Sequence, residues 1–270
     1  MKGDEWSANL GRKLMRGEQS AGMTFRLFLL ALTLAASGSA AAQAAYRMDS
    51  YVTLNGKTQP AFAWCDAPDR VLALTNPAKA PASPQPVTLA RWLKRAPNKI
   101  QTGTYQLGPG EGAAGTIFVA LNPAKQPDSD GNVRLSNVLN VNDPAYRMSA
   151  VNGFKTPYED VRCRYVPDAA FMGVTAKRTV IIWENGGKIT YATRNFDGTL
   201  EVYLTGGTVA HDDIGPEYTF NKAGYTYLIK FHPYAAFVQV KQGTKLLQTE
   251  PFLAYSISTP LTRTPTQEQP

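Results

Sequence analysis

The densest group of side chains that could carry acid–base or metal chemistry is one short acidic segment. It contains His211, Asp212, Asp213 and Glu217. Imidazole and carboxylate groups can bind a metal ion or transfer protons when a fold brings them together. The same segment is flanked by glycines and a Gly-Pro step, which are typical of a loop. We therefore favour a solvent-exposed connecting loop that contacts a partner, and a carboxylate-dependent hydrolase is the alternative.

Two further motifs resemble cofactor or metal sites but lack the required context. Residues 110–115 read G-x-G-x-x-G, yet the apolar run that follows, 116–121, reads as a strand rather than the helix that would bind a phosphate. Residues 128–132 begin like a calcium loop but lead into another strand without the closing glutamate. The sequence also lacks a G-x-S-x-G nucleophile motif. We expect no cofactor, no metal and no catalytic residues, and hence a protein that is not an enzyme.

The chain has two cysteines, Cys65 and Cys163. In an exported protein, two cysteines favour a disulfide over a pair of buried thiols. Such a bond would tie the first half of the chain to the second and close a long loop. Two cysteines and two distant histidines do not have the spacing of a zinc site.

The N-terminal segment is typical of a secretory leader. Arg26 precedes the apolar run Leu27–Ala36, and small residues follow as far as Ala44. The apolar run has about ten residues, whereas a bilayer span needs roughly 20. We therefore predict a signal peptide over residues 1–44 and a periplasmic or extracellular protein without a stable membrane span, and a membrane anchor is the alternative.

The charge balance is mildly positive. The chain has 28 basic and 21 acidic residues, of which the leader holds five and three, so the processed protein keeps a net charge of +5. This excess suits contact with an anionic cell-wall polymer, although it could equally serve solubility. Because no dense Lys/Arg run occurs, we do not expect nucleic acid as a partner.

The elements that must position these residues read as strands. Short apolar runs alternate with Gly, Pro, Asn and Asp, which indicates an all-β antiparallel sandwich or barrel. One short helix is expected over residues 88–95, where Leu89, Trp92 and Leu93 share a helical face. Before it, four prolines predict an extended loop over residues 77–86. The strands expected in the first half are 71–75, 104–107, 116–121 and 133–141.

The second half shows clearer hairpins. Asn185-Gly186-Gly187 separates the predicted strands 178–184 and 188–194, and both residue types accept positive φ. Alternating runs then predict an antiparallel meander. We divide the processed chain into a region 45–160, a β domain 161–258 and a loose tail 259–270, while one continuous β unit remains the alternative. The strands of the meander are expected near 200–204, 225–232, 237–241 and 245–249.

Aromatic residues are abundant and could form either core or contact surface. Trp64, Trp92 and Trp183 are candidate core anchors. Tyrosine on an exposed sheet face can bind a polymer or a protein. The aromatic residues concentrated in the second half are Tyr191, Phe196, Tyr203, Tyr218, Tyr225, Tyr227 and Tyr234.

The run from Ile214 to Tyr218, the strand that ends at Lys230 and the hairpin around Gly243 resemble the membrane-bound inhibitor of C-type lysozyme family. The resemblance covers less than half of the chain. It implies a small exported antiparallel β-barrel in which Gly215 and Tyr218 lie in an inhibitory loop with Lys230 beside it. The chain departs from that pattern at Ile214 and Pro216, and it lacks the family's closing cysteine.

These observations together predict a non-enzymatic binding or inhibitory module of the cell envelope. Its partner would be a protein or an anionic wall polymer. The candidate binding residues are His211, Asp212, Asp213, Gly215, Glu217, Tyr218 and Lys230. A structural envelope protein without a small ligand is a further alternative.

Overall fold

A computed structural model describes residues 46–78, 84–136, 147, 150–197, 199–212, 215–232 and 235–260. The leader 1–44, Asp213 and the last ten residues of the predicted tail lie outside these ranges. The described chain is all-β, as predicted, and its regular elements are strands. No described segment forms a helix with the length and apolar content needed to cross a bilayer.

Nineteen strands are formed within the described ranges. Their bounds are β1 Tyr46–Leu54, β2 Lys57–Asp66, β3 Arg70–Thr75, β4 Gln85–Leu93, β5 Ile100–Ala113, β6 Thr116–Pro123, β7 Asn132–Ser136, β8 Val151–Thr156, β9 Glu159–Arg162, β10 Ala169–Val174, β11 Arg178–Asn185, β12 Lys188–Asn195, β13 Leu200–Thr205, β14 Thr208–Asp212, β15 Gly215–Lys222, β16 Tyr225–His232, β17 Ala235–Gln242, β18 Lys245–Pro251 and β19 Ala254–Pro260.

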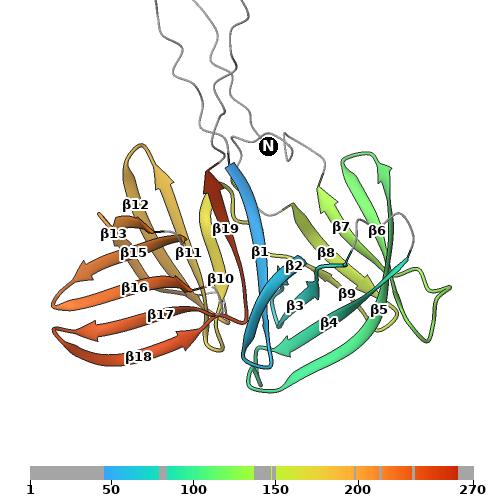
Figure 1. Ribbon diagram of the computed structural model, residues 1–270, viewed down its shortest axis with the longest axis horizontal. Helices are drawn as coiled ribbons and strands as arrows, with labels where there is room; N and C mark the ends of the chain where they lie inside the picture. The colour runs from blue at the N-terminus through green and yellow to red at the C-terminus, as the bar shows by residue number, and fades with distance from the viewer. Residues whose placement is uncertain are drawn as a thin grey trace, which may run out of the picture. The chain divides into compact units, whose positions relative to one another are not determined.

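The strands form two antiparallel sheets. A fourteen-stranded sheet has the order β13-β12-β11-β10-β19-β1-β2-β3-β4-β5-β6-β7-β8-β9, and a five-stranded sheet has the order β14-β15-β16-β17-β18. The last strand, β19, lies between β10 and β1, so the two ends of the described chain meet side by side (Figure 1). Most neighbours in the sheets are also neighbours in the sequence, as expected for hairpin-connected strands.

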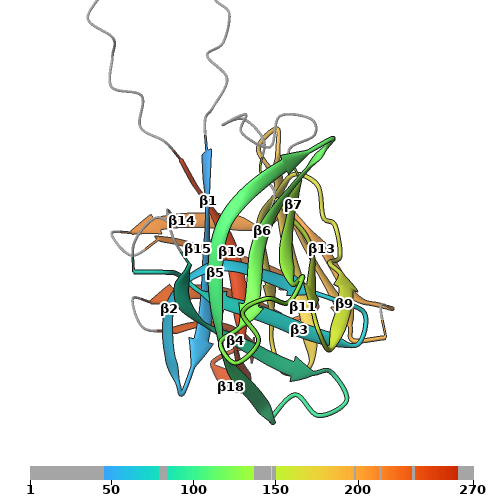
Figure 2. The ribbon, with the colours of Figure 1, turned by 90° about the vertical axis from the view of Figure 1, so that its right-hand side faces the viewer.

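Strands β2–β9 form what we call the first lobe. The long strand β5 is strongly curved (Figure 2), and β8 returns to contact β2, so this part of the sheet rolls around its own apolar face. Side chains that alternate inward from successive strands fill the interior. Leu72, Leu107, Leu121, Val133 and Phe154 are among its buried members.

Strands β10–β19, with β1, form the second lobe. The five-stranded sheet runs across strands β10–β12 (Figure 1), which is the arrangement of two sheets packed at a steep angle. The core between the sheets is rich in aromatic side chains. Phe171 packs edge-on against Phe231 and Phe252, with ring centroids 5.2 and 5.1 Å apart.

The predicted disulfide is confirmed. Cys65 at the end of β2 is bonded to Cys163, which directly follows β9, across a sequence separation of 98 residues. In the chain-entropy treatment, closing a loop of this length stabilises the fold by roughly 4–5 kcal/mol. A third apolar cluster, which includes Trp64, Trp92 and Ile181, packs residues of both lobes together.

The helix predicted over residues 88–95 is wrong, because most of this segment belongs to β4. Leu89 faces the core of the first lobe, whereas Ala90 and Trp92 face the cluster shared by both lobes. A strand buried on both faces has apolar residues at consecutive positions, and these can imitate helical spacing. Pro86 also lies in β4, opposite Gln106, where β4 extends beyond the end of its pairing with β3.

The predicted hairpin at Asn185-Gly186-Gly187 is confirmed. Asn185 pairs with Lys188, and Gly186 and Gly187 have φ of 56° and 78°. Positive φ at both central residues matches the right-handed twist of the strands, which explains the glycine pair. Three strands of the predicted meander, near 225–232, 237–241 and 245–249, correspond to β16, β17 and β18. The prediction is wrong for 200–204, which is β13 of the fourteen-stranded sheet, and the segment predicted as a connecting loop instead contributes β14 and β15 to the five-stranded sheet.

Candidate functional site

The sequence-predicted binding residues lie on β14, β15 and β16. His211 is exposed on the edge strand β14 and pairs with Pro216, while Asp212 pairs with Gly215. Gly215, the first residue of β15, has φ of +146°, a backbone conformation that favours glycine. The described residues of this hairpin are therefore spread along two strands.

The remaining predicted residues point to opposite faces of the five-stranded sheet. Glu217 forms an ion pair with Lys230, with 2.8 Å between Oε2 and Nζ, and both side chains are partly exposed. Tyr218, one position further, is 1 % exposed and lies in the core between the sheets. The structure thus brings Glu217 and Lys230 together but separates them from Tyr218.

Tyr218 belongs to a partly buried chain of polar contacts. Its hydroxyl donates to Oε1 of Glu184 over 2.8 Å, and Arg147 binds the other oxygen of Glu184 at 2.7 Å. Arg147 also covers the ring of Tyr46, 3.5 Å from the centroid. Burial, reinforced by Glu184, raises the pKa of Tyr218 well above its usual range. The phenol is therefore a fixed hydrogen-bond donor that stabilises the second lobe.

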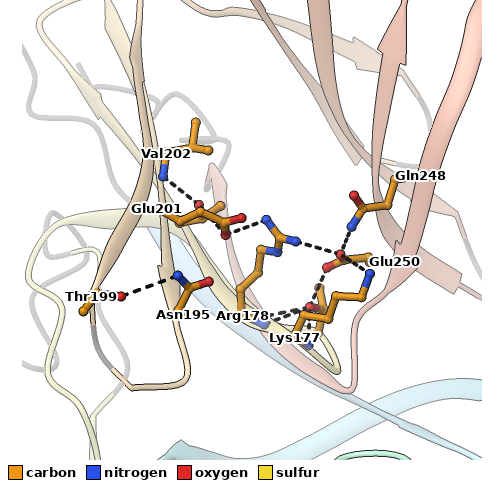
Figure 3. Close-up of polar contacts among 10 residues, drawn as sticks. Lys177, Arg178, Asn195, Thr199, Glu201, Val202, Gln248 and Glu250 are labelled. Atoms are coloured by element: carbon orange, nitrogen blue, oxygen red, sulfur yellow. Dashed lines mark hydrogen bonds and ion pairs between the residues drawn. The ribbon is translucent and has the colours of Figure 1, made fainter.

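A second polar network of the second lobe joins its two sheets (Figure 3). Arg178 binds Glu201 at 2.5 Å and Glu250 at 3.1 Å, and Thr175 donates to Glu250 over 2.8 Å. Lys177 lies 3.4 Å from the same carboxylate. Because these carboxylates are already bound by cations, we interpret the network as structural.

No group of three or more His, Cys, Asp or Glu side chains that could hold a metal ion occurs among the residues that the structure describes. The predicted acidic cluster forms no such group within its described part. Two cavities formed by described residues lie in the first lobe instead.

The most prominent exposed aromatic residue of the first lobe is Tyr158, which is 67 % exposed. It lies in the two-residue turn between β8 and β9, where Thr156 pairs with Glu159. The buried Thr156 accepts a hydrogen bond from the Tyr158 backbone N–H over 3.2 Å and is also hydrogen-bonded to Tyr105. The residue two positions before the exposed ring is therefore fixed in the core.

The residue after Tyr158 is equally constrained. The Glu159 side chain is only 5 % exposed and is bound by both Arg70 and Arg91. These arginines come from β3 and β4, so the ion pairs tie the last strand of the first lobe back to its beginning. Asp69 binds Arg70 from the other side at 2.6 Å. The turn that carries the exposed Tyr158 is thus anchored on both sides, at Thr156 and at Glu159.

Beside Tyr158 is a small open cleft with a volume of ≈ 130 Å³. Arg91 donates to Oε1 of Gln101 there through a long contact of 3.4 Å, and its Nε has no hydrogen-bond partner among the described residues. Gly103 keeps the cleft open, since a Cβ there would lie 3.1 Å from the Tyr105 ring. Burial raises the pKa of Tyr105, so its hydroxyl is neutral. The cleft is lined by Leu89, Arg91, Gln101, Thr102, Gly103, Tyr105 and Tyr158.

A larger cavity of ≈ 410 Å³ has a mostly basic lining. It is lined by Asp69, Arg70, Leu93, Lys94 and Arg95. Arg70 lines this cavity and Arg91 lines the first, and both bind Glu159, so the two cavities are neighbours. Arg95 is exposed and forms no ion pair with a described residue. We call the two cavities together the basic cleft.

Beneath this surface, Lys94 binds a fully buried carboxylate. Its Nζ lies 2.6 Å from Asp66, which also accepts from Thr179 over 2.7 Å and lies 3.3 Å from Arg164. Burial lowers the pKa of Lys94 from its ordinary value, and Asp66 opposes that shift. Since Asp66 and Arg164 follow the two cysteines of the disulfide, this cluster reinforces the junction of the lobes.

Sequence reasoning missed the basic cleft. Its residues come from β3, β4, β5, the β2–β3 turn, the segment after β4 and the β8–β9 turn. Arg70 and Arg91 precede Glu159 by 89 and 68 positions. A local signal existed in Thr156-Pro157-Tyr158-Glu159, which reads as a tight turn with an aromatic residue at its tip.

Comparison of this chain with known protein families, with curated proteins and with solved structures finds no match. The resemblance to the lysozyme-inhibitor family therefore stays a prediction.

Proposed function

We propose that this protein is an exported, non-enzymatic binding module of the cell envelope, and that it contacts its partner through the first lobe around Tyr158. The observation that carries the proposal is an exposed tyrosine on a turn whose backbone is anchored on both sides. Ordering a segment on binding costs free energy, and a turn that is already ordered reduces that cost. Rigid aromatic residues beside arginine are the side chains that most often dominate binding energy.

The acidic hairpin gives weaker support for a contact site. Glu217 is neutralised by Lys230, and Tyr218 cannot reach a partner without opening the core. These contacts favour the first lobe over the loop that the sequence singled out. The disulfide favours an oxidising compartment, which is consistent with export.

The proposal is tested by cosedimentation of the protein, recovered after expression of the full chain, with isolated cell-envelope material. Tyr158→Ala is expected to weaken binding about tenfold, as for a central aromatic contact. Tyr203→Ala is the matched control, because Tyr203 is a comparably exposed tyrosine, 52 % exposed, on the second lobe. Wild-type binding by the Tyr158 variant, or no binding by the wild type, would refute the proposal.

A further inference from the structure

The size of the cavity beside Tyr158 restricts what it can bind. Sites that enclose a whole small-molecule ligand typically measure about 300–1,000 Å³. A cavity of ≈ 130 Å³ that opens to solvent is too small for such a ligand but can accept one unit of a chain. The neighbouring cavity of ≈ 410 Å³ provides room for the chain to continue.

The lining of the cleft suits a sugar unit. A pyranose ring has an apolar C–H face and a rim of hydroxyl groups. The exposed ring of Tyr158 can receive the apolar face, while Gln101 and Thr102 can exchange hydrogen bonds with the rim. A protein partner would instead favour a contiguous apolar centre surrounded by polar residues. Here the exposed aromatic residue is surrounded by polar and charged groups.

The charge of the cleft selects an acidic unit. The Nε of Arg91 is buried, but its Nη1 makes only a long, exposed contact of 3.4 Å to Gln101, so this nitrogen can still donate to a ligand in the cleft. Arg70 and Lys94 in the larger cavity are paired with Asp69, Glu159 and Asp66, whereas Arg95 is exposed and forms no ion pair with a described residue, so Arg95 supplies the available positive charge there. Guanidinium groups bind carboxylates through paired, charge-assisted hydrogen bonds.

From these observations we propose that the basic cleft binds an acidic polysaccharide. One carboxylate-bearing sugar unit stacks on Tyr158 with its carboxylate toward Arg91, and the next acidic unit lies in the cavity beside Arg95. This inference rests on the proposed function and specifies the ligand class of the same site.

The test measures binding of the full-chain product to alginate, a soluble polyuronate, with neutral dextran as the comparison. The wild type is expected to bind alginate and not dextran, with an affinity that falls as salt is added. Tyr158→Ala is expected to raise the dissociation constant about tenfold, and Tyr158→Phe to leave it within about threefold, since stacking survives. Arg95→Gln should weaken binding a few-fold and reduce its salt dependence. Tyr203→Ala, with equal thermal stability, is the control.

Failure of this inference can be told apart from failure of the proposed function. Tyr158-dependent binding to envelope material without binding to alginate overturns the polysaccharide assignment alone and indicates a protein partner. Equal binding of dextran and alginate overturns the role of the arginines. A dissociation constant for alginate that is unchanged in Tyr158→Ala would exclude the basic cleft as the binding site. Absence of binding to both alginate and envelope material refutes the proposed function as well.

Discussion

Replacing Asp66 by asparagine should destabilise the protein strongly, with a loss that depends on pH. The Asp66 side chain is fully buried, and the Lys94 side chain paired with it is only 4 % exposed. The variant keeps the shape of the site and its contact with Thr179 but leaves the ammonium group without its nearest counter-ion. Breaking a buried pair in this way costs about 3–5 kcal/mol. Total stabilities of domains are only about 5–15 kcal/mol.

The pH dependence follows from Lys94. Burial already lowers the pKa of Lys94 below 10.5, and Asp66 counteracts this effect. Removing the Asp66 carboxylate lowers the pKa of Lys94 in the folded protein further. The pKa falls by one unit for each roughly 1.4 kcal/mol of attraction lost between the ammonium group and the carboxylate. Between that pKa and 10.5 the unfolded chain binds the proton more tightly than the folded protein, so stability rises with pH. The difference between the variant and the wild type should therefore be largest at neutral pH and shrink as pH approaches 10.5.

Urea unfolding of both proteins at neutral and alkaline pH, with the disulfide intact, measures this difference. Glu217→Gln is the control, because it breaks a partly exposed ion pair with Lys230 and should cost less than about 1 kcal/mol. The double variant Asp66→Leu with Lys94→Met removes both charges and should recover most of the loss. The reasoning would be refuted if Asp66→Asn lowered the free energy of unfolding no more than Glu217→Gln does, or if the loss were independent of pH.

Three further predictions concern the rest of the fold. Reducing the Cys65–Cys163 disulfide should lower the free energy of unfolding by roughly 2–5 kcal/mol, measured by thermal unfolding with and without a thiol; an unchanged midpoint would contradict it. Gly173→Ala should lower the free energy of unfolding by about 1–3 kcal/mol, because the added Cβ would lie 2.7 and 2.8 Å from two phenylalanine rings. Gly112→Ala is the control and should preserve the unfolding midpoint, because its added Cβ would meet nothing within 4 Å. Because the pKa of Tyr218 is raised, the folded protein keeps the phenol proton at pH values where the unfolded chain has lost it. The free energy of unfolding should therefore fall above pH 10.0, and it should fall less steeply in Tyr218→Phe. Equal pH slopes of the free energy of unfolding in the two proteins would exclude this role.

The fold class could be predicted because strand formation leaves local signals. Alternation and the Asn185-Gly186-Gly187 turn identified the hairpins of the second half, and the cysteine pair identified the disulfide. The segment around Trp92 misled the prediction because β4 is buried on both faces and does not alternate. Which strands join across the chain, such as β19 beside β1, has no local signal.

The candidate site could not be predicted for the same reason. We predicted a binding site at the acidic residues near His211 because they are close together in the sequence. In the structure, Glu217 is instead paired with Lys230 across a hairpin. The site that we propose depends on Tyr158. The turn that carries it has a local sequence signal, but Glu159 in that turn is bound by residues far away in the sequence, and this binding has no such signal. Contacts over tens of positions, such as Arg91 with Glu159, arise only once the sheet has rolled up.

The central position of β19 has a consequence for the order of assembly. Synthesis makes this strand after all the others, yet it occupies the gap between β10 and β1, and Ser50 meets Ser256 across a separation of 206 residues. Until those final residues are available, the strands on either side of the gap have no hydrogen-bonding partner there, and the sheet consists of two unjoined pieces. Contacts between such distant positions form slowly. Completion of the fourteen-stranded sheet therefore depends on residues 254–260 being available.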